Sequence, residues 1–163
     1  MDPQRNFSLS IAARSPQELL GQMSRLYVLS RSLHTAAELG VADLIGDAPV
    51  SAAEVAHTVG VSEEYLARCL RFLAAYGVFE ETSSGWFRGT ALSEVMKDDH
   101  PRSMRPVLRM VSREWWDAAG RLPDVVRSGR SGFDLAHDRS FFEVLKSEPE
   151  LQRRFNDGMS SIS

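Results

Sequence analysis

Cysteine and long apolar runs are scarce in this sequence. Its 163 residues contain one cysteine, Cys69, which excludes a disulfide within a single chain and fits a reducing cytoplasm. No apolar run is long enough to span a bilayer, and the polar start MDPQRNFSLS lacks the hydrophobic core of a secretory signal. The net charge of −3 argues against broad contact with nucleic acid or an anionic membrane. We therefore expect a cytoplasmic globular chain.

The motifs that mark common cofactor and metal sites are also missing. No two glycines are separated by a single residue, so there is no GxGxxG fingerprint, and P-loop, HExxH and paired CxxC motifs are absent. The four histidines are scattered through the chain, at His34, His57, His100 and His137. Asp98 and Asp99 lie together in a polar break, which is more typical of solvated carboxylates than of an acid–base pair. We predict no catalytic residue and no metal site within this chain.

Residues 51–90 predict a winged helix. Ser51 and Glu54 form a capping-box pattern that begins a short helix, and Gly60 ends it. Ser62 begins a second helix that runs to about Tyr76. Its apolar face comprises Tyr65, Leu66, Cys69, Leu70, Phe72, Leu73 and Tyr76.

Two strand-like runs, 78–82 and 86–88, flank the turn sequence Ser83-Ser84-Gly85 and complete the wing, and Thr90 caps a further helix. A winged helix often binds DNA, and a winged-helix transcription regulator is one alternative here. However, Arg68 and Arg71 are the only basic residues of the second helix, and its groove-entering end carries two glutamates.

The N-terminal part predicts a flexible tail at 1–14 and one helix of roughly 35 Å, starting at Ser15-Pro16 and ending at Leu39. Its apolar seam comprises Leu19, Met23, Leu26, Leu33 and Ala37, and Leu20, Tyr27 and Val28 lie outside that seam. A helix apolar on more than one side needs more than one neighbour. Burial within its own chain is possible, but we favour packing against a second copy. A short helical turn follows at 41–45.

The last third is expected to be helical, giving a mainly α fold with a two-stranded wing. Helices are predicted at about 103–111, 113–128 and 141–146, with a loop from Arg130 to Arg139. A last helix begins at Ser147-Glu148-Pro149. The predicted division is a tail at 1–14, a winged-helix domain at 15–100 and a helical segment at 101–163. This segment gathers large apolar groups: Met110, Trp115, Trp116, Phe133, Phe141, Phe142, Phe155 and Met159. They can line a pocket for a flat apolar molecule or form a helical core.

An ordered set of motifs resembles the N-terminal dimerisation domain of class I S-adenosylmethionine-dependent small-molecule O-methyltransferases, of the bacterial natural-product type. The motifs are Leu39–Ile45, Leu66–Leu73, Gly77–Phe79, Thr90–Ser93, Trp115-Trp116, Leu122–Leu145 and Phe155–Met159. The resemblance implies that the wing is a scaffold and that the later helices roof a substrate pocket. It implies substrate contacts for Phe155 and Met159, beside our candidates Met110, Trp116 and Phe142. It also implies cofactor contacts for Phe155, Met159 and Ser163.

The resemblance further implies a parent protein whose S-adenosylmethionine site and catalytic base lie in a Rossmann-like domain absent from this sequence. We expect this chain alone to bind no cofactor, and to form a homodimer through its N-terminal helices. The parent is expected to methylate a phenolic or polyketide-like hydroxyl, with no nucleic acid or membrane as a partner. A standalone dimerisation partner of a methyltransferase is the other alternative.

Overall fold

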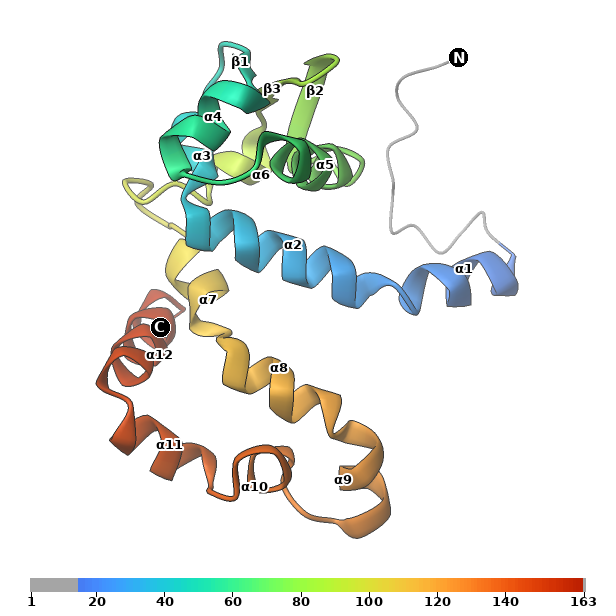
Figure 1. Ribbon diagram of the computed structural model, residues 1–163, viewed down its shortest axis with the longest axis vertical. Coiled ribbons are helices and arrows are strands. Elements are labelled where there is room, and N and C mark those ends of the chain that lie inside the picture. The colour runs from blue at the N-terminus through green and yellow to red at the C-terminus, as the bar shows by residue number, and fades with distance from the viewer. Residues whose placement is uncertain (1–14, 163) are drawn as a thin grey trace. The chain divides into compact units, whose positions relative to one another are not determined.

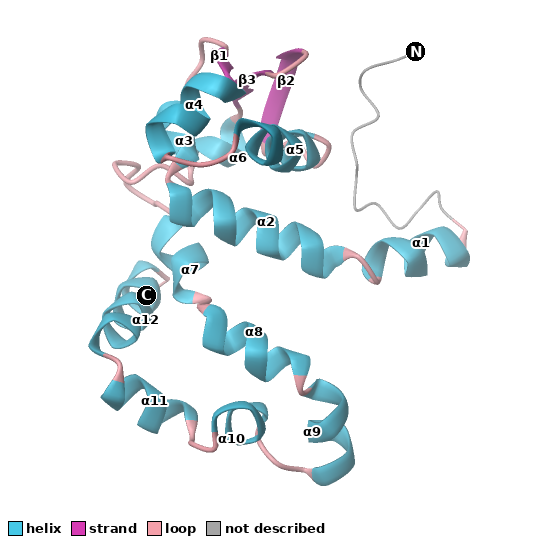
Figure 2. Cartoon of the chain, in the orientation of Figure 1, coloured by secondary structure: helices cyan, strands magenta, loops and turns pink. Residues whose placement is uncertain are grey.

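The computed structural model describes residues 15–162, and these form two compact units whose boundary in the sequence falls between Ser103 and Met104. Helices make up most of both units, and three short strands form a small sheet in the first (Figure 2). The mainly α winged-helix fold is thereby confirmed. The predicted tail at 1–14 and the candidate Ser163 lie outside the described residues.

The single N-terminal helix predicted from the sequence is wrong, because the structure has two helices there: α1 (Pro16–Met23) and α2 (Leu26–Leu39) (Figure 1). The break falls at Ser24 and Arg25. The Ser24 hydroxyl donates to the carbonyl of Gly21 at 2.9 Å, and Arg25 adopts φ −108° and ψ 0°. Glycine and serine are weak helix formers, and a serine bond to the nearby backbone competes with helix continuation.

Serine caps fix three of the predicted helix starts. The hydroxyls of Ser15, Ser51 and Ser140 accept hydrogen bonds from the amide three residues later, at 3.2, 3.1 and 3.4 Å. At Ser15 and Ser140 the glutamate in that position accepts a bond from the serine amide in return. Hydrogen bonds from the hydroxyl and then the amide of Ser140 hold the pKa of Glu143 below its usual range. Each helix start therefore has a local cause readable in the sequence.

The winged helix lies in the first unit, with α4 and α5 as its two main helices (Figure 1). Its elements are α3 (Val41–Leu44), β1 (Val50–Ser51), α4 (Ala52–Val59), α5 (Glu63–Ala74), β2 (Phe79–Ser83), β3 (Trp86–Gly89) and α6 (Ala91–Glu94). The strands are antiparallel in the order β1-β3-β2. The predicted two-stranded wing therefore misses β1, since two residues are too few to show an alternating pattern.

The core of the first unit gathers side chains from every layer of the winged helix. Its largest fully buried side chains include Val41, Ile45, Val55, Leu70, Leu73, Phe79 and Phe87. Phe79 and Phe87 come from β2 and β3, so the wing is anchored by its own strands against the helices. Cys69 is a free thiol and is half-buried in this unit.

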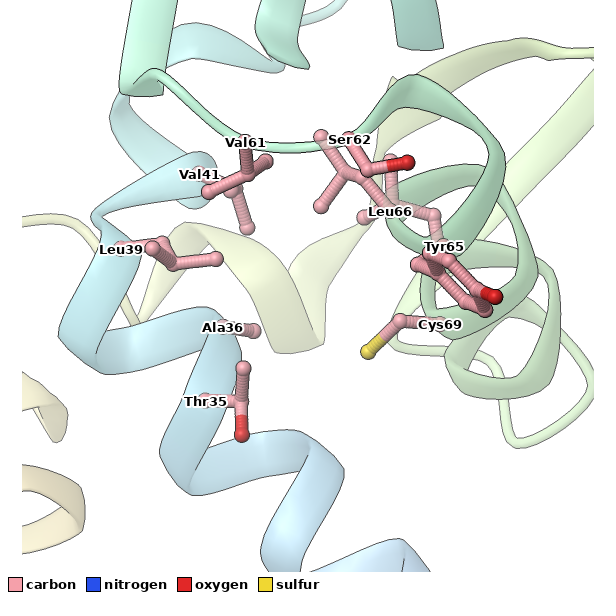
Figure 3. Close-up of a pocket in the computed structure, with 10 residues that line it drawn as sticks. Thr35, Ala36, Leu39, Val41, Val61, Ser62, Tyr65, Leu66 and Cys69 are labelled. Atoms are coloured by element: carbon pink, nitrogen blue, oxygen red, sulfur yellow. The ribbon is translucent and has the colours of Figure 1, made fainter.

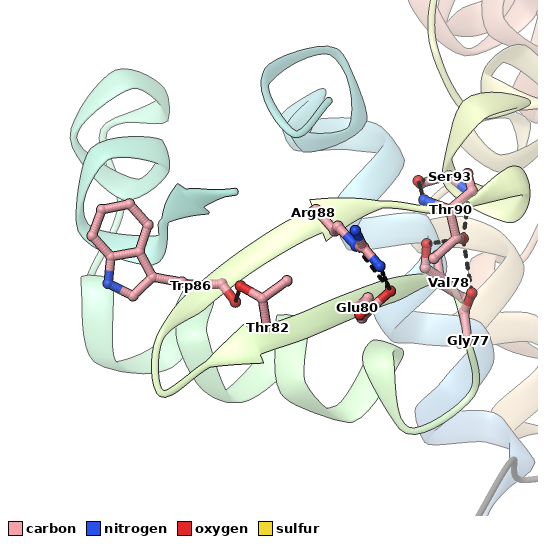
Figure 4. Close-up of polar contacts among 8 residues, drawn as sticks. All are labelled: Gly77, Val78, Glu80, Thr82, Trp86, Arg88, Thr90 and Ser93. Carbon is pink, nitrogen blue, oxygen red and sulfur yellow. Dashed lines mark hydrogen bonds and ion pairs between the residues drawn. The ribbon is translucent and has the colours of Figure 1, made fainter. Parts of the chain in front are cut away.

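Thr90 joins the end of α5, the wing and the start of α6 (Figure 4). Its hydroxyl lies 2.8 Å from the carbonyl oxygens of both Gly77 and Val78, and its oxygen accepts the amide of Leu92 at 3.2 Å. The buried Ser93 hydroxyl in turn accepts the Thr90 amide at 2.8 Å. The Thr90 side chain thus bonds to backbone carbonyls that follow α5 and to a backbone amide at the start of α6, which would otherwise lack partners.

Six helices form the second unit: α7 (Arg105–Met110), α8 (Arg113–Gly120), α9 (Leu122–Ser128), α10 (Gly132–His137), α11 (Phe141–Ser147) and α12 (Pro149–Ser161). Two sequence predictions are wrong here. The helix expected at 113–128 breaks at Arg121, because Pro123 occupies the first turn of α9 and disfavours continuation from α8. The loop expected from Arg130 to Arg139 contains α10, which tertiary contacts stabilise.

Tight packing of α10 on α8 is the main such contact. A Cβ atom added to Gly132 would lie 2.7 Å from the carbonyl oxygen of Ala118, closer than side chains approach a backbone. Phe133, the next residue, packs edge-on against Trp115 of α8 and Phe141 of α11. The helix therefore depends on neighbours that local composition does not reveal.

We predict that Thr90→Val lowers the free energy of unfolding by about 1–2 kcal/mol, because valine keeps the shape and removes the cap and both carbonyl contacts. Thr82→Val is the matched control, since the exposed Thr82 hydroxyl makes only a long 3.4 Å bond to the Trp86 carbonyl (Figure 4). Its effect should stay within about 0.5 kcal/mol. Urea unfolding of both variants checks this, and equal losses would contradict the role given to Thr90.

Gly132→Ala should destabilise the protein by about 1–3 kcal/mol, because the new methyl group meets a backbone oxygen that cannot rotate away. Gly120→Ala is the control, since an added Cβ there meets nothing within 4 Å. It should be neutral or stabilising by up to about 1 kcal/mol. Thermal unfolding distinguishes them, and an unchanged melting temperature for Gly132→Ala would show that α8 and α10 can separate freely.

Candidate functional site

The winged-helix face does not present free cations for nucleic acid. Arg71 makes two-pronged hydrogen bonds to Glu81, with Nε–Oε2 and Nη2–Oε1 distances of 2.9 Å. These bonds hold the pKa of the Glu81 carboxyl below its usual range, and the same carboxylate accepts the Gly85 amide. Arg68 lies 4.0 Å from the Glu64 carboxylate. Arg68 and Arg71 of α5 therefore both lie beside carboxylates, which reduces the attraction of these two arginines for phosphate.

An aromatic cluster in the second unit links four helices. It is defined by Trp115 of α8, Phe133 of α10, Phe141 of α11 and Phe155 of α12. Phe141 is its centre, with ring centroids 5.4 Å from Trp115, 5.0 Å from Phe133 and 5.2 Å from Phe155, all edge-to-face. Such pairs add about 0.5–1.5 kcal/mol each beyond area burial. The cluster therefore fixes the direction in which α12 leaves α11.

Phe155 and Phe142 occupy different positions around this cluster. Phe155 is partly buried within it, beside the buried Leu151 and Leu145. Phe142 is 67% exposed, and its ring lies 5.4 Å from that of Phe141, measured between centroids. Of our candidate substrate contacts, Phe155 thus has a packing role as well, whereas Phe142 offers a free aromatic face.

Met110 lies on α7, the first helix of the second unit, and Met159 lies on α12, which packs against α7. Met159 is 42% exposed, and its spacing of four residues from Phe155 places both on one side of α12. Met110 packs over Gly158: an added Cβ there would lie 2.7 Å from the Met110 Cβ and 2.8 Å from its Sδ. Helix α7 therefore approaches α12 closely enough to bring Met110 beside the helix that carries Phe155 and Met159.

Gly158 is a position whose packing role the sequence analysis missed. An isolated glycine within an amphipathic helix was the available signal for close helix packing. The buried indole N–H of Trp115 has no hydrogen-bond acceptor within residues 15–162. Trp116 is partly buried on α8.

Few groups capable of proton or metal chemistry gather in the described chain. Within residues 15–162, no group of three or more histidine, cysteine or acidic side chains could hold a metal ion. His137 donates from Nε2 to the backbone carbonyl of Glu114 at 3.1 Å and its ring lies against Phe133, so it ties α10 to α8. Over the same residues, the helices are too short or too polar to cross a membrane.

A separate cavity of about 210 Å³ lies in the first unit, between α2 and α5 (Figure 3). Side chains from both helices and from the α4–α5 connection face it, among them Ala36, Val61, Tyr65 and Cys69. Its surface is almost entirely apolar. None of the candidate site residues named from the sequence lines it.

Comparison with known proteins identifies the first unit. The family model described as the O-methyltransferase dimerisation domain matches residues 22–99. The phenazine O-methyltransferase PhzM of Lysobacter antibioticus is 37% identical over 145 residues, which is 89% of this chain and 42% of that protein.

Solved structures agree with this assignment. The LaPhzM crystal structure superposes with a TM-score of 0.86 at 35% identity, over 91% of this chain and 45% of that chain. The O-methyltransferase NcsB1 from neocarzinostatin biosynthesis, in complex with S-adenosylmethionine and 2-hydroxy-5-methyl naphthoic acid, gives 0.70 at 31% identity, over 82% and 42%. The chain spans less than half the length of these relatives. With its matching winged helix, this chain belongs to the family of O-methyltransferase dimerisation domains, of the kind found in bacterial natural-product enzymes.

Proposed function

We propose that this chain is the dimerisation and substrate-roof part of an S-adenosylmethionine-dependent O-methyltransferase that acts on a small phenolic or polyketide-like natural product. The observation that carries the proposal is the extent of the similarity to LaPhzM, which covers 91% of the chain and so includes both units. The aromatic cluster and the α7–α12 contact therefore belong to a fold shared with a methyltransferase. A DNA-binding function is disfavoured by the carboxylates that face Arg68 and Arg71.

In the proposed reaction, the sulfonium methyl group of the cofactor passes to a hydroxyl oxygen of the acceptor, which loses its proton. The contribution of this chain is shape. Met110, Phe155 and Met159 would form an apolar wall against the acceptor ring, with the exposed face of Phe142 and the partly buried Trp116 as further contacts. Such a wall orients the acceptor oxygen and excludes water from the transfer. Phe155, Met159 and Ser163 are the proposed contacts to the cofactor.

The proposed assembly is a cytoplasmic homodimer held through the N-terminal helices. The matched family is a dimerisation domain, and it covers α2 together with the whole winged helix. Leu20, Met23 and Tyr27 leave apolar surface on α1 and α2 that a second copy can cover.

Methyl transfer by the full-length protein tests the proposed activity. With methyl-labelled S-adenosylmethionine and a panel of phenols and hydroxylated naphthoates, we expect label on a hydroxyl oxygen and one S-adenosylhomocysteine per methyl group transferred. The same panel with every hydroxyl already methylated is the control and should stay unlabelled. Transfer to a ring nitrogen or carbon only, or no cofactor turnover with any acceptor, would contradict an O-methyltransferase.

Met159→Ala in the full-length enzyme should raise the acceptor KM roughly tenfold with the melting temperature unchanged, because its partly exposed side chain contributes contact area worth roughly 1–3 kcal/mol. Phe155→Ala should affect both KM and stability, since its ring also packs on Phe141. Leu92→Ala, at an exposed leucine of the first unit, serves as the control and should change neither quantity. A stability loss with unaltered kinetics for Phe155 and Met159 would assign both to the helical core instead.

A further inference from the structure

The first unit carries an uncovered apolar stripe, defined here as Leu20, Met23 and Tyr27. These side chains are 66%, 56% and 64% exposed, and they run from α1 across the helix break into α2. Three large apolar groups in a row are unusual on a free surface and mark an interaction site. Arg25, an exposed cation, lies within the stripe.

The cavity between α2 and α5 is concave, whereas the stripe protrudes. We call this cavity the socket, and its lining residues are those drawn in Figure 3. Ala36, Leu66 and Leu70 are buried and Cys69 is half-buried in its wall, while Tyr65 is 66% exposed at its edge. A cavity of about 150 Å³ can hold benzene. The socket, at about 210 Å³, therefore has room for one side chain of the size of Leu, Met or Tyr.

The charges beside the two surfaces are complementary. Arg25 lies within the stripe, whereas Glu63 and Glu64 begin α5 directly beside Ser62 and Tyr65 of the socket. Glu64 also lies 4.0 Å from Arg68, so Glu63 is the main uncompensated charge there among the described residues. All three charged side chains are exposed, so they can influence which surfaces meet and in what orientation. Both helices that form the socket lie inside residues 22–99, the matched dimerisation domain.

We propose that the stripe of one copy of this chain inserts a side chain into the α2–α5 socket of a second copy. The inference rests on the proposed homodimer and specifies how it is held. In a twofold-symmetric dimer the contact occurs twice, so two stripes fill two sockets. Each contact removes an exposed apolar side chain from water and fills a space that is otherwise open.

Cysteine cross-linking of the full-length protein tests the contact directly, because Cys69 is the only cysteine of the described chain and lines the socket. We would introduce Leu20→Cys, Met23→Cys or Tyr27→Cys singly, remove any cysteine outside this sequence, and oxidise at alkaline pH, since burial raises the pKa of the Cys69 thiol. At least one variant should form a disulfide-linked dimer joining the new cysteine to Cys69. The same variant with Cys69→Ser should lose that bond, and Ala53→Cys, on exposed α4 surface, should not cross-link to Cys69.

Closing the socket provides an independent test. Thr35 is an exposed residue of its lining, so Thr35→Trp should block the opening without disturbing the core, and should raise the dimer dissociation constant at least tenfold. Thr58→Trp is the matched control. Thr58 is also exposed, and the hydroxyls of Thr35 and Thr58 each donate to the backbone carbonyl four residues earlier. Sedimentation equilibrium should show an unchanged dimer for Thr58→Trp.

The outcomes separate the two proposals. A protein that is monomeric without substitutions overturns the homodimer and this contact together. A stable dimer in which no stripe cysteine joins Cys69, or in which Thr35→Trp leaves the dissociation constant unchanged, overturns the contact and keeps the homodimer. Linkage to Cys69 within one chain, identified by mass at the monomer position, also overturns it.

Discussion

Close approach of helices at two glycines is the constraint on which the second unit depends. Gly132 lets the first turn of α10 meet the Ala118 carbonyl of α8, and Gly158 lets Met110 of α7 pack directly on α12. These contacts leave no room for a β-carbon, so the helices have little freedom to slide. The positions of Phe155 and Met159, which α12 carries, follow from that packing as much as from their own side chains.

The aromatic cluster holds the short helices of the second unit together. None of α7 to α11 exceeds eight residues, and helices of that length are unstable alone in water. Edge-to-face contacts centred on Phe141 join α8, α10, α11 and α12. Phe155, a proposed substrate contact, is thereby held by a neighbouring ring, which is how a site can keep its geometry without long elements.

In the first unit, a fold often used to bind DNA has its α5 arginines beside carboxylates. Glu81 on β2 takes both prongs of Arg71 on α5 and also the Gly85 amide of the wing turn, so the cation stabilises the wing. Glu80 pairs with Arg88 across β2 and β3, where Nε and Nη2 of Arg88 both donate to the Oε2 atom of Glu80, at 2.9 and 2.7 Å. Burial of Phe79 and Phe87 then anchors the wing to the core. The most exposed large apolar side chains of this unit are Leu20, Met23, Tyr27 and Tyr65, on α1, α2 and α5, and Leu92 on α6.

The sequence by itself determined the elements whose causes are local. Serine caps at Ser15, Ser51 and Ser140 and left-handed glycines at Gly40 and Gly60 set several helix ends, and the apolar face of α5 sets its side of the winged helix, because each acts within a few residues. Tertiary structure decided α10, β1 and the contact of Met110 with Gly158, because these are stabilised by partners 14 or more residues away in the chain. It also decided that Phe155 lies within the aromatic cluster whereas Phe142 faces outward. The sequence does not show this difference, because the burial of an aromatic side chain depends on which side its helix turns to the neighbouring helices.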